Sequence, residues 1–207
     1  MRFLYTLPFL FAFLSCAPPS GQRIASTVSK EKKGDTYSMK LEYPQIVGAP
    51  EAFNKLLEVA ALTHLEQVED SPLPFDEYAR NIATESAGQK WAFESIMKVA
   101  HLQGLTLTTL CKTYTNTGAA HPNVFHYYEV YDLTTRKRLE LDDLLETGKL
   151  PALRALAKAP ADSSSEPAIG LLPDHLVYRA DPDARMVEDV KIPYGQLKGI
   201  LKSRYIP

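Results

Sequence analysis

Residues 105–133 read LTLTTLCKTYTNTGAAHPNVFHYYEVYDL, and this stretch decides the fold. The run before TNTGAAHPN (Thr115 to Asn123) predicts a β-strand, because its apolar positions recur with a period of two. The run after it, VFHYYEVYDL, predicts a second strand. The two strands are therefore expected to form an antiparallel pair joined at TNTGAAHPN.

The connection itself has an unusual composition. Gly118 can take positive φ at little cost. Pro122 moves His121 out of the helical region and into an extended conformation. Asn123 tolerates turns and can bond to its own backbone. We therefore expect a wide connection that re-aims the chain between the strands, and either local geometry or a binding site explains its composition.

The residues before this pair predict one strand, two helices and another strand. DTYSMKLEYPQIVG alternates apolar and polar residues, and Gln89 to Val99 does the same, as half-buried strands do. APEAFNKLLEVAALTHLEQVED has apolar residues at three- and four-residue steps, which predicts an amphipathic helix. FDEYARNIATESAG predicts a second, shorter helix.

The residues after the pair predict short elements. Two short helices are expected in LDDLLETGKLPALRALAKA. Short strands are expected in AIGLLPDHLVYRADPDARMVEDVKIPY, and a closing helix is expected in GQLKGILKSRY. Helices and strands do not alternate along the chain as they do in parallel α/β proteins. The sequence therefore predicts an α+β fold with an antiparallel sheet and helices packed on one face.

The first residues predict export. Arg2 precedes twelve nearly all apolar residues, a run too short to span a membrane and typical of a secretory signal. FLSC then resembles a bacterial lipobox, which predicts a signal peptide at 1–15 and lipidation of Cys16. Plain secretion and an uncleaved anchor are the alternatives. Ala17 resembles the signal that sorts lipoproteins to the outer membrane of Gram-negative bacteria.

Residues 16–34 are predicted to form a flexible tether, since proline, serine, glycine and lysine dominate them. Residues 35–207 are then expected to form one folded domain. Removing residues 1–15 takes away Arg2, and 22 basic residues then face 25 acidic ones, a net charge of −3. Such a balance argues against nucleic acid as a partner.

Five short motifs also occur in a familiar order: YSMKLEYPQIVG, FNKLL, KTYTNTGAAHPN, YDLTTRKRLELDDLL and VKIPYGQLKGIL. This order resembles an extracytoplasmic bacterial domain pair of unknown function. The pair forms the outer part of a lysozyme-sensing anti-sigma factor and lies beside peptidoglycan deacetylase domains. The resemblance implies an N-terminal half at 35–100 and a C-terminal half at 101–207. The deacetylase activity belongs to a separate domain and is not implied here.

This sequence departs from the family pattern at two places. Ala119 stands where the family has a second glycine, and the loop at 181–189 lacks the tyrosines and glycine that the family carries there. A role of that loop is therefore not implied for this chain.

The candidate ligand-binding residues lie in and beside the hairpin connection. Their side chains combine hydrogen-bond donors and acceptors with aromatic surface, a mixture that suits a carbohydrate or a protein loop. The residues are Tyr114, Thr117, Gly118, His121 and Asn123.

Metal binding and catalysis find weaker support. His121 and His126 are five residues apart, and no third ligand accompanies them, whereas zinc needs three protein ligands or more. Asp132, Asp142 or Asp143 could supply a third ligand only if the fold brought it close to the two histidines. There is no Gly-x-Ser-x-Gly motif. The sequence therefore predicts no cofactor, no metal and no catalytic residue, and Cys111, His64, His101 and His175 are expected to be structural.

The leading hypothesis is a lipid-anchored protein of the cell envelope, at the outer membrane facing the periplasm, with a non-enzymatic binding domain. By resemblance, its ligand is peptidoglycan or a lysozyme-like hydrolase. A cell-wall hydrolase that uses His121 and an acid supplied by the fold is the alternative. A scaffold protein without a small ligand is a third hypothesis.

Overall fold

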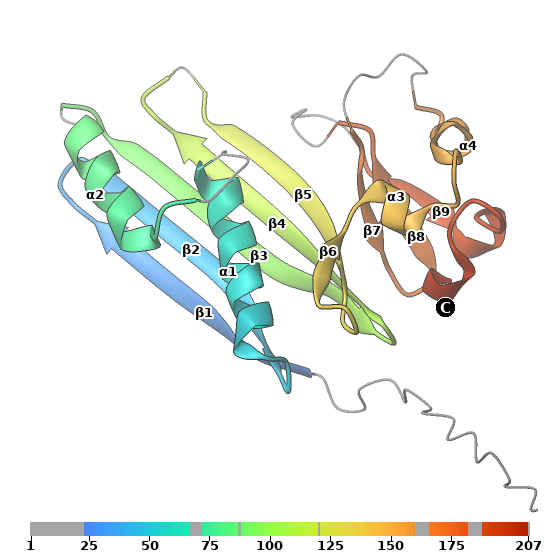
Figure 1. Ribbon diagram of the computed structural model, residues 1–207. Helices are drawn as coiled ribbons and strands as arrows, with labels where there is room; N and C mark the ends of the chain where they lie inside the picture. Colours follow the sequence, from blue (N-terminus) through green and yellow to red (C-terminus); the bar gives the residue numbers. More distant parts are fainter. Residues whose placement is uncertain are drawn as a thin grey trace, which may run out of the picture.

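The computed structural model describes residues 23–66, 72–86, 88–119, 121–159, 166–181 and 188–206. The predicted signal peptide and Cys16 lie outside these residues, so lipid anchoring stays a prediction. Two sheets form the fold (Figure 1). No helix in the described ranges has the length and apolar character that a membrane span requires.

The larger sheet has six strands in the order β1-β2-β3-β4-β5-β6. The strands are β1 (Arg23–Lys33), β2 (Tyr37–Val47), β3 (Trp91–Gln103), β4 (Thr106–Asn116), β5 (Asn123–Asp132) and β6 (Lys137–Leu139). All neighbours are antiparallel except β2 and β3, which run parallel with Tyr37 opposite Trp91. The sheet is thus mixed, which corrects the prediction of an antiparallel sheet. The parallel pair arises because two helices carry the chain back between these strands.

Those helices, α1 (Glu51–Glu66) and α2 (Phe75–Glu85), lie on one face of the sheet (Figure 1). Leu57 and Ala61 of α1 are fully buried against Leu41 of β2, within one hydrophobic cluster. The hydroxyl of Ser95 donates a 2.8 Å hydrogen bond to the Ala61 carbonyl. The predicted α+β class and the packing of these helices on one face are confirmed.

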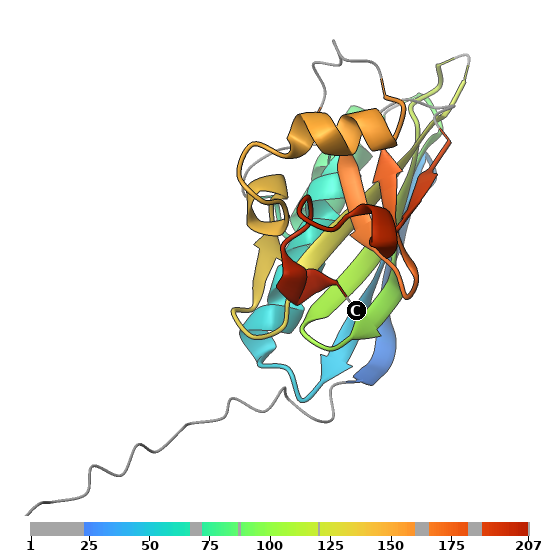
Figure 2. The ribbon, with the colours of Figure 1, turned by 90° about the vertical axis from the view of Figure 1, so that its right-hand side faces the viewer.

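The smaller sheet is antiparallel, with β7 (Ala168–Leu171), β8 (His175–Arg179) and β9 (Val190–Pro193) in that order. It packs on the other face of the large sheet, at β4 and β5 (Figure 2). Gly170 makes this approach close, since a Cβ there would lie 2.7 Å from the Tyr128 ring and 3.2 Å from Thr108. Thr108 Oγ1 donates to the Leu171 carbonyl at 2.7 Å and accepts from its N–H at 3.2 Å.

A second hydrophobic cluster fills the space around this small sheet. It includes Val130 of β5, α3 (Leu141–Leu144), α4 (Leu150–Leu156) and the C-terminal segment to Tyr205. The two buried clusters therefore meet at β5. The predicted boundary at residue 100 lies inside β3, which pairs with β4 on both sides of that position.

Two further predictions are wrong. Residues 23–33 are not tether but strand β1, which pairs with β2 from Arg23↔Val47 to Lys33↔Ser38. Its polar composition suits an edge strand with one face in water. GQLKGILKSRY does not form a helix, and two short 3-10 turns, Tyr194–Gln196 and Ser203–Tyr205, stand there instead. Gly199, with φ of 74°, interrupts the helical path between them.

Candidate functional site

The hairpin between β4 and β5 forms an exposed tip. Thr117, Gly118 and His121 are all exposed there. Gly118 has φ of 82°, as its expected role requires, and its N–H donates a 3.0 Å hydrogen bond to Asn116 Oδ1. This bond fixes the turn of the chain after β4.

Two residues outside the predicted set support the tip. A Cβ on Gly118 would lie 2.9 Å from Gln89 Oε1, so the glycine allows this close approach. The same Gln89 oxygen accepts a 3.3 Å hydrogen bond from Trp91 Nε1. Trp91 is the only tryptophan of the chain, and its ring is half-buried beside Phe93. No local signal in the sequence marks this contact, because Gln89 and Gly118 are far apart along the chain.

The structure does not gather all five predicted residues on one surface. Tyr114 pairs with Val124, while Asn123 pairs with Thr115. Adjacent strand residues point to opposite faces, so Tyr114 and Asn123 lie on different sides of the sheet. Asn123 shares the face of Trp91 and the helices, whereas Tyr114 lies on the opposite face.

Ala119, which departs from the family pattern, adds no backbone strain. Positive φ outside glycine occurs, within the described ranges, at Arg136 and Lys158, with values of 60° and 53°. A second glycine is therefore not needed to build this tip.

Two of the three acids named as potential metal ligands, Asp132 and Asp143, have structural partners. Asp132 Oδ1 accepts hydrogen bonds from the N–H groups of Thr134 and Thr135, at 2.7 and 2.9 Å. Asp143 closes a capping box with Glu140 at the start of α3. Within the described residues, no group of three or more histidine, cysteine or acidic side chains could hold a metal ion.

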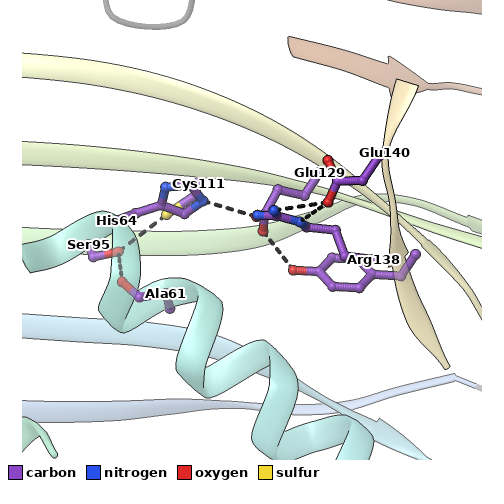
Figure 3. A network of polar contacts seen from close by, with 8 residues as sticks. Ala61, His64, Ser95, Cys111, Glu129, Arg138 and Glu140 are labelled. Atoms are coloured by element: carbon purple, nitrogen blue, oxygen red, sulfur yellow. Dashed lines mark hydrogen bonds and ion pairs between the residues drawn. The ribbon is translucent and has the colours of Figure 1, made fainter. Parts of the chain in front are cut away.

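A buried carboxylate, Glu129, lies far from the tip on the helix side of β5 (Figure 3). It is 7 % exposed. Tyr131 Oη donates to its Oε2 at 2.6 Å, and Arg138 Nη1 donates to its Oε1 at 3.1 Å. His64 of α1 stacks on Tyr127 and places Nε2 3.3 Å from the same Oε1. The histidine approach is an electrostatic contact, since Nε2 makes no well-directed hydrogen bond.

Burial alone would raise the pKa of Glu129, but its partners reverse that effect. Contacts with His64, the Tyr131 hydroxyl and the Arg138 charge lower the pKa to about 2. The carboxylate is thus ionised at neutral pH. It lines a cavity of about 190 Å³ together with Glu140 and Glu166. Its oxygens are already committed to partners within the protein, so the network ties α1, β5 and β6 together.

A second polar cluster joins the small sheet to the opposite face of β5. Arg179 of β8 donates from Nε to Asp189 Oδ1 at 2.9 Å, and Tyr128 Oη donates to Asp189 Oδ2 at 2.9 Å. His126 Nδ1 lies 3.4 Å from Arg179 Nη2. Burial, Arg179 and Lys112 lower the pKa of His126, so it is neutral beside them. Asp189 belongs to the divergent loop, most of which lies outside the described residues.

The remaining sulfur and imidazole groups fit their expected structural roles. Cys111 is fully buried and 3.2 Å from Ser95 Oγ, and burial raises the pKa of its thiol to about 12. The thiol is therefore not a reactive nucleophile at neutral pH. His175 pairs with Asp174. His101 lies beside a second cavity, near the C-terminal segment.

Comparisons with known proteins relate the fold to one family. No family model matches the chain, and no curated protein matches it. A crystal structure of a DUF3298 family protein from Pseudomonas aeruginosa PAO1 matches 88% of this chain and 96% of its own, with a TM-score of 0.68 and 20% identity. The crystal structure of a DUF3298 family member from Bacteroides fragilis NCTC 9343 matches 91% of this chain and 96% of its own, with a TM-score of 0.62 and 14% identity.

The chain has the fold of DUF3298 proteins. The resemblance to a bacterial domain of unknown function, expected from the five motifs, is thus confirmed at the level of fold. At these identities the likeness carries no activity, substrate or partner across.

Proposed function

We propose that this chain is a lipid-anchored protein of the cell envelope whose folded part binds a ligand without catalysing a reaction. The ligand is peptidoglycan or a lysozyme-like hydrolase. Anchoring follows from the lipobox at Cys16, with the outer membrane facing the periplasm as its place. The choice of ligand follows from the resemblance of the motifs.

The observation that carries the proposal is the exposed tip of the β4–β5 hairpin, in which the N–H of Gly118 is bonded to Asn116. His121 and Thr117 are exposed, while the Asn116–Gly118 hydrogen bond and the approach of Gln89 hold the backbone at Gly118. Backbone that is already held at one position loses less conformational entropy there on binding. The nearby Trp91 ring adds the aromatic surface on which sugars and loops commonly rest.

Two features favour binding over hydrolysis. Glu129 is a buried carboxylate, and its pKa of about 2 keeps it from donating a proton at neutral pH. It also follows Asn123 by six residues along β5, or roughly 20 Å at about 3.4 Å per residue. It is therefore not the acid that a hydrolase based on His121 needs.

The test uses the chain without residues 1–15 and with Cys16→Ser, so that the protein is soluble. Binding to peptidoglycan fragments and to lysozyme is measured through Trp91 fluorescence and calorimetry. The proposal expects saturable binding to one of them, at least tenfold weaker in His121→Ala and Asn123→Ala. Lys198→Ala, at an exposed residue near the C-terminus, is the matched control and should bind normally.

Release of soluble fragments from peptidoglycan by the wild-type chain, abolished in a folded His121→Ala variant, would instead establish the hydrolase. Normal folding without binding to either ligand would contradict the proposed ligands.

A further inference from the structure

A cavity at the other end of the large sheet has the make-up of a small-molecule site. It measures about 190 Å³, and residues of the β3–β4 turn, β7 and the C-terminal segment line it. A cavity of about 150 Å³ holds a benzene-sized ligand, so this one accommodates a ring or a short branched chain. Its apolar lining consists of Leu105, Leu171, Tyr194, Tyr205 and Ile206.

The apolar walls are firmly held. Leu171 and Tyr205 are buried in the second core, and Tyr194 Oη donates a 2.7 Å hydrogen bond to the Leu172 carbonyl. The cavity lies at the edge of the second hydrophobic cluster, to which Leu171, Tyr194 and Tyr205 belong. Gly104, with φ of 60°, forms the β3–β4 turn at its side.

Two nitrogen-bearing side chains, Arg204 and His101, also line the cavity, together with Thr106. The Arg204 guanidinium lies 4.5 Å from the centre of the Tyr205 ring, and its Nη2 donates to Tyr205 Oη. These are its contacts within the described part of the chain, and neither supplies a negative charge. Burial lowers the pKa of His101, so its ring is neutral at pH 7 and offers a hydrogen bond without charge.

The two carboxylates that act on Tyr205 have other partners. Asp132 and Asp143 both affect the Tyr205 hydroxyl electrostatically. Asp132, however, accepts from the N–H groups of Thr134 and Thr135, and Asp143 accepts from the N–H of Glu140. An oriented guanidinium beside an apolar cavity thus has no anion of its own in the described structure.

We propose that this cavity binds an apolar carboxylate, with its hydrocarbon part between Leu171 and Tyr205 and its carboxylate on Arg204. A guanidinium presents a planar set of donors that matches the two oxygens of a carboxylate. A neutral analogue of the same shape would lose that charged pair, and an amine would be repelled. The ligand is either a free small acid or the C-terminal carboxylate of a peptide with an apolar last residue.

This inference does not rest on the proposed function. The cavity borders the first residue of β4, whereas the hairpin tip follows its last residue. Eleven strand residues separate them by roughly 35 Å at about 3.4 Å per residue. Ligands at the two places can therefore be told apart by mapping.

The experiment titrates 3-phenylpropanoate and its amide into the ¹⁵N-labelled chain lacking residues 1–15, with Cys16→Ser, at pH 7. A dipeptide ending in leucine and its C-terminal amide form the second arm. The expected result is saturable chemical-shift change at Leu105, Leu171 and Ile206 with an acid, and at least tenfold weaker binding of the matching amide. The arm that saturates at lower concentration identifies the source of the carboxylate.

Variants separate charge from shape. Arg204→Gln should weaken binding of the acid at least tenfold and leave binding of the amide unchanged, while Lys198→Gln should leave both unchanged. Equal binding of acid and amide, shift changes confined to other parts of the chain, or no shift change at millimolar acid would each overturn the proposal. Circular dichroism of Arg204→Gln checks its fold, and the acid–amide comparison decides the outcome without any variant.

Discussion

Tyr131 Oη donates a 2.6 Å hydrogen bond to Glu129 Oε2, and both side chains are almost completely buried. The two residues lie on the same face of β5, two positions apart. The bond keeps a charged carboxylate inside the core, because burial and the carboxylate raise the pKa of Tyr131 well above its usual range and keep its proton in place. The Glu129 network is thus a stabilising element whose contribution depends on pH.

Glu129 should make the protein lose stability in acid. Its pKa falls from an ordinary 4.5 to about 2 in the folded state. A carboxylate whose pKa is lower in the folded state stabilises the fold at pH values above its unfolded-state pKa. The full contribution of Glu129 is therefore present above about pH 4.5, and it disappears as the pH falls to about 2. Its size is about 3 kcal/mol, from 1.36 kcal/mol per pKa unit. Urea unfolding of wild type and Glu129→Gln at several pH values measures it.

The difference between the two unfolding curves isolates Glu129 from other carboxylates that titrate in the same range. We expect the wild-type advantage to shrink between pH 4.5 and pH 2. Glu146→Gln, which removes an exposed carboxylate outside the Glu129 network, should follow the wild-type curve closely. A constant difference across that range would mean that Glu129 is not held ionised in this way.

Thr108→Val should weaken the junction between the two sheets. The hydroxyl serves both the N–H and the carbonyl of Leu171, and valine keeps the shape but leaves two buried backbone groups without this partner. We expect a loss of about 1–3 kcal/mol in the free energy of unfolding. Thr135→Val, at an exposed turn position, is the control and should change stability by less than about 0.5 kcal/mol. Equal losses of stability in the two variants would argue against a role of the Thr108 hydroxyl in joining the two sheets.

Removing β1 should destabilise the whole fold. A chain that begins at residue 35 loses the pairing with β2 and the ion pair of 2.6 Å between Lys30 and Glu58. It also exposes β2 as a new edge that favours aggregation. We expect a melting temperature at least about 10 °C below that of a chain that begins at residue 17, given about 2–4 °C per kcal/mol at this size. Equal melting temperatures would restore the prediction that residues 23–33 are a tether.

Gly118→Ala should disturb the hairpin tip. The backbone of alanine is strained at φ of 82°. Its Cβ would also lie 2.9 Å from Gln89 Oε1, so the Gln89 side chain must move and lose its hydrogen bond with Trp91. We expect a loss of about 1–2 kcal/mol and a shift in tryptophan fluorescence. Gly148→Ala, at φ of 71° with nothing within 4 Å, carries the backbone penalty alone and should leave the fluorescence unchanged. A fluorescence shift in both variants would contradict the contact.

Local patterns in the sequence predict much of this fold. Apolar residues at every second position predict β2, β3, β4 and β5. Apolar residues at three- and four-residue steps predict α1 and α2. Both patterns work because the side chains of the buried face recur with the period of the strand or the helix. Strand β1 was missed because RIASTVSKEKK has few apolar residues. Its stability comes from pairing with β2, which composition does not reveal. The parallel β2–β3 pair depends likewise on how the two helices return the chain.

The site was less predictable than the fold. Gly118 and His121 stand out in the sequence, and the structure places both at an exposed tip. Gln89 reaches that tip from another turn, and such a long-range contact leaves no local pattern. Glu129 and Arg138 have ordinary strand contexts, and the sequence does not show that the Glu129 carboxylate is buried where Arg138 pairs with it.

The most direct test of the central claim is binding of the soluble chain to peptidoglycan fragments and to lysozyme, followed by Trp91 fluorescence in wild type, His121→Ala and Asn123→Ala. Saturable binding by the wild type, lost in both folded variants and kept in Lys198→Ala, is the predicted result. Equal binding by all four proteins, or binding by none, would contradict the assignment of the β4–β5 hairpin tip as the recognition surface.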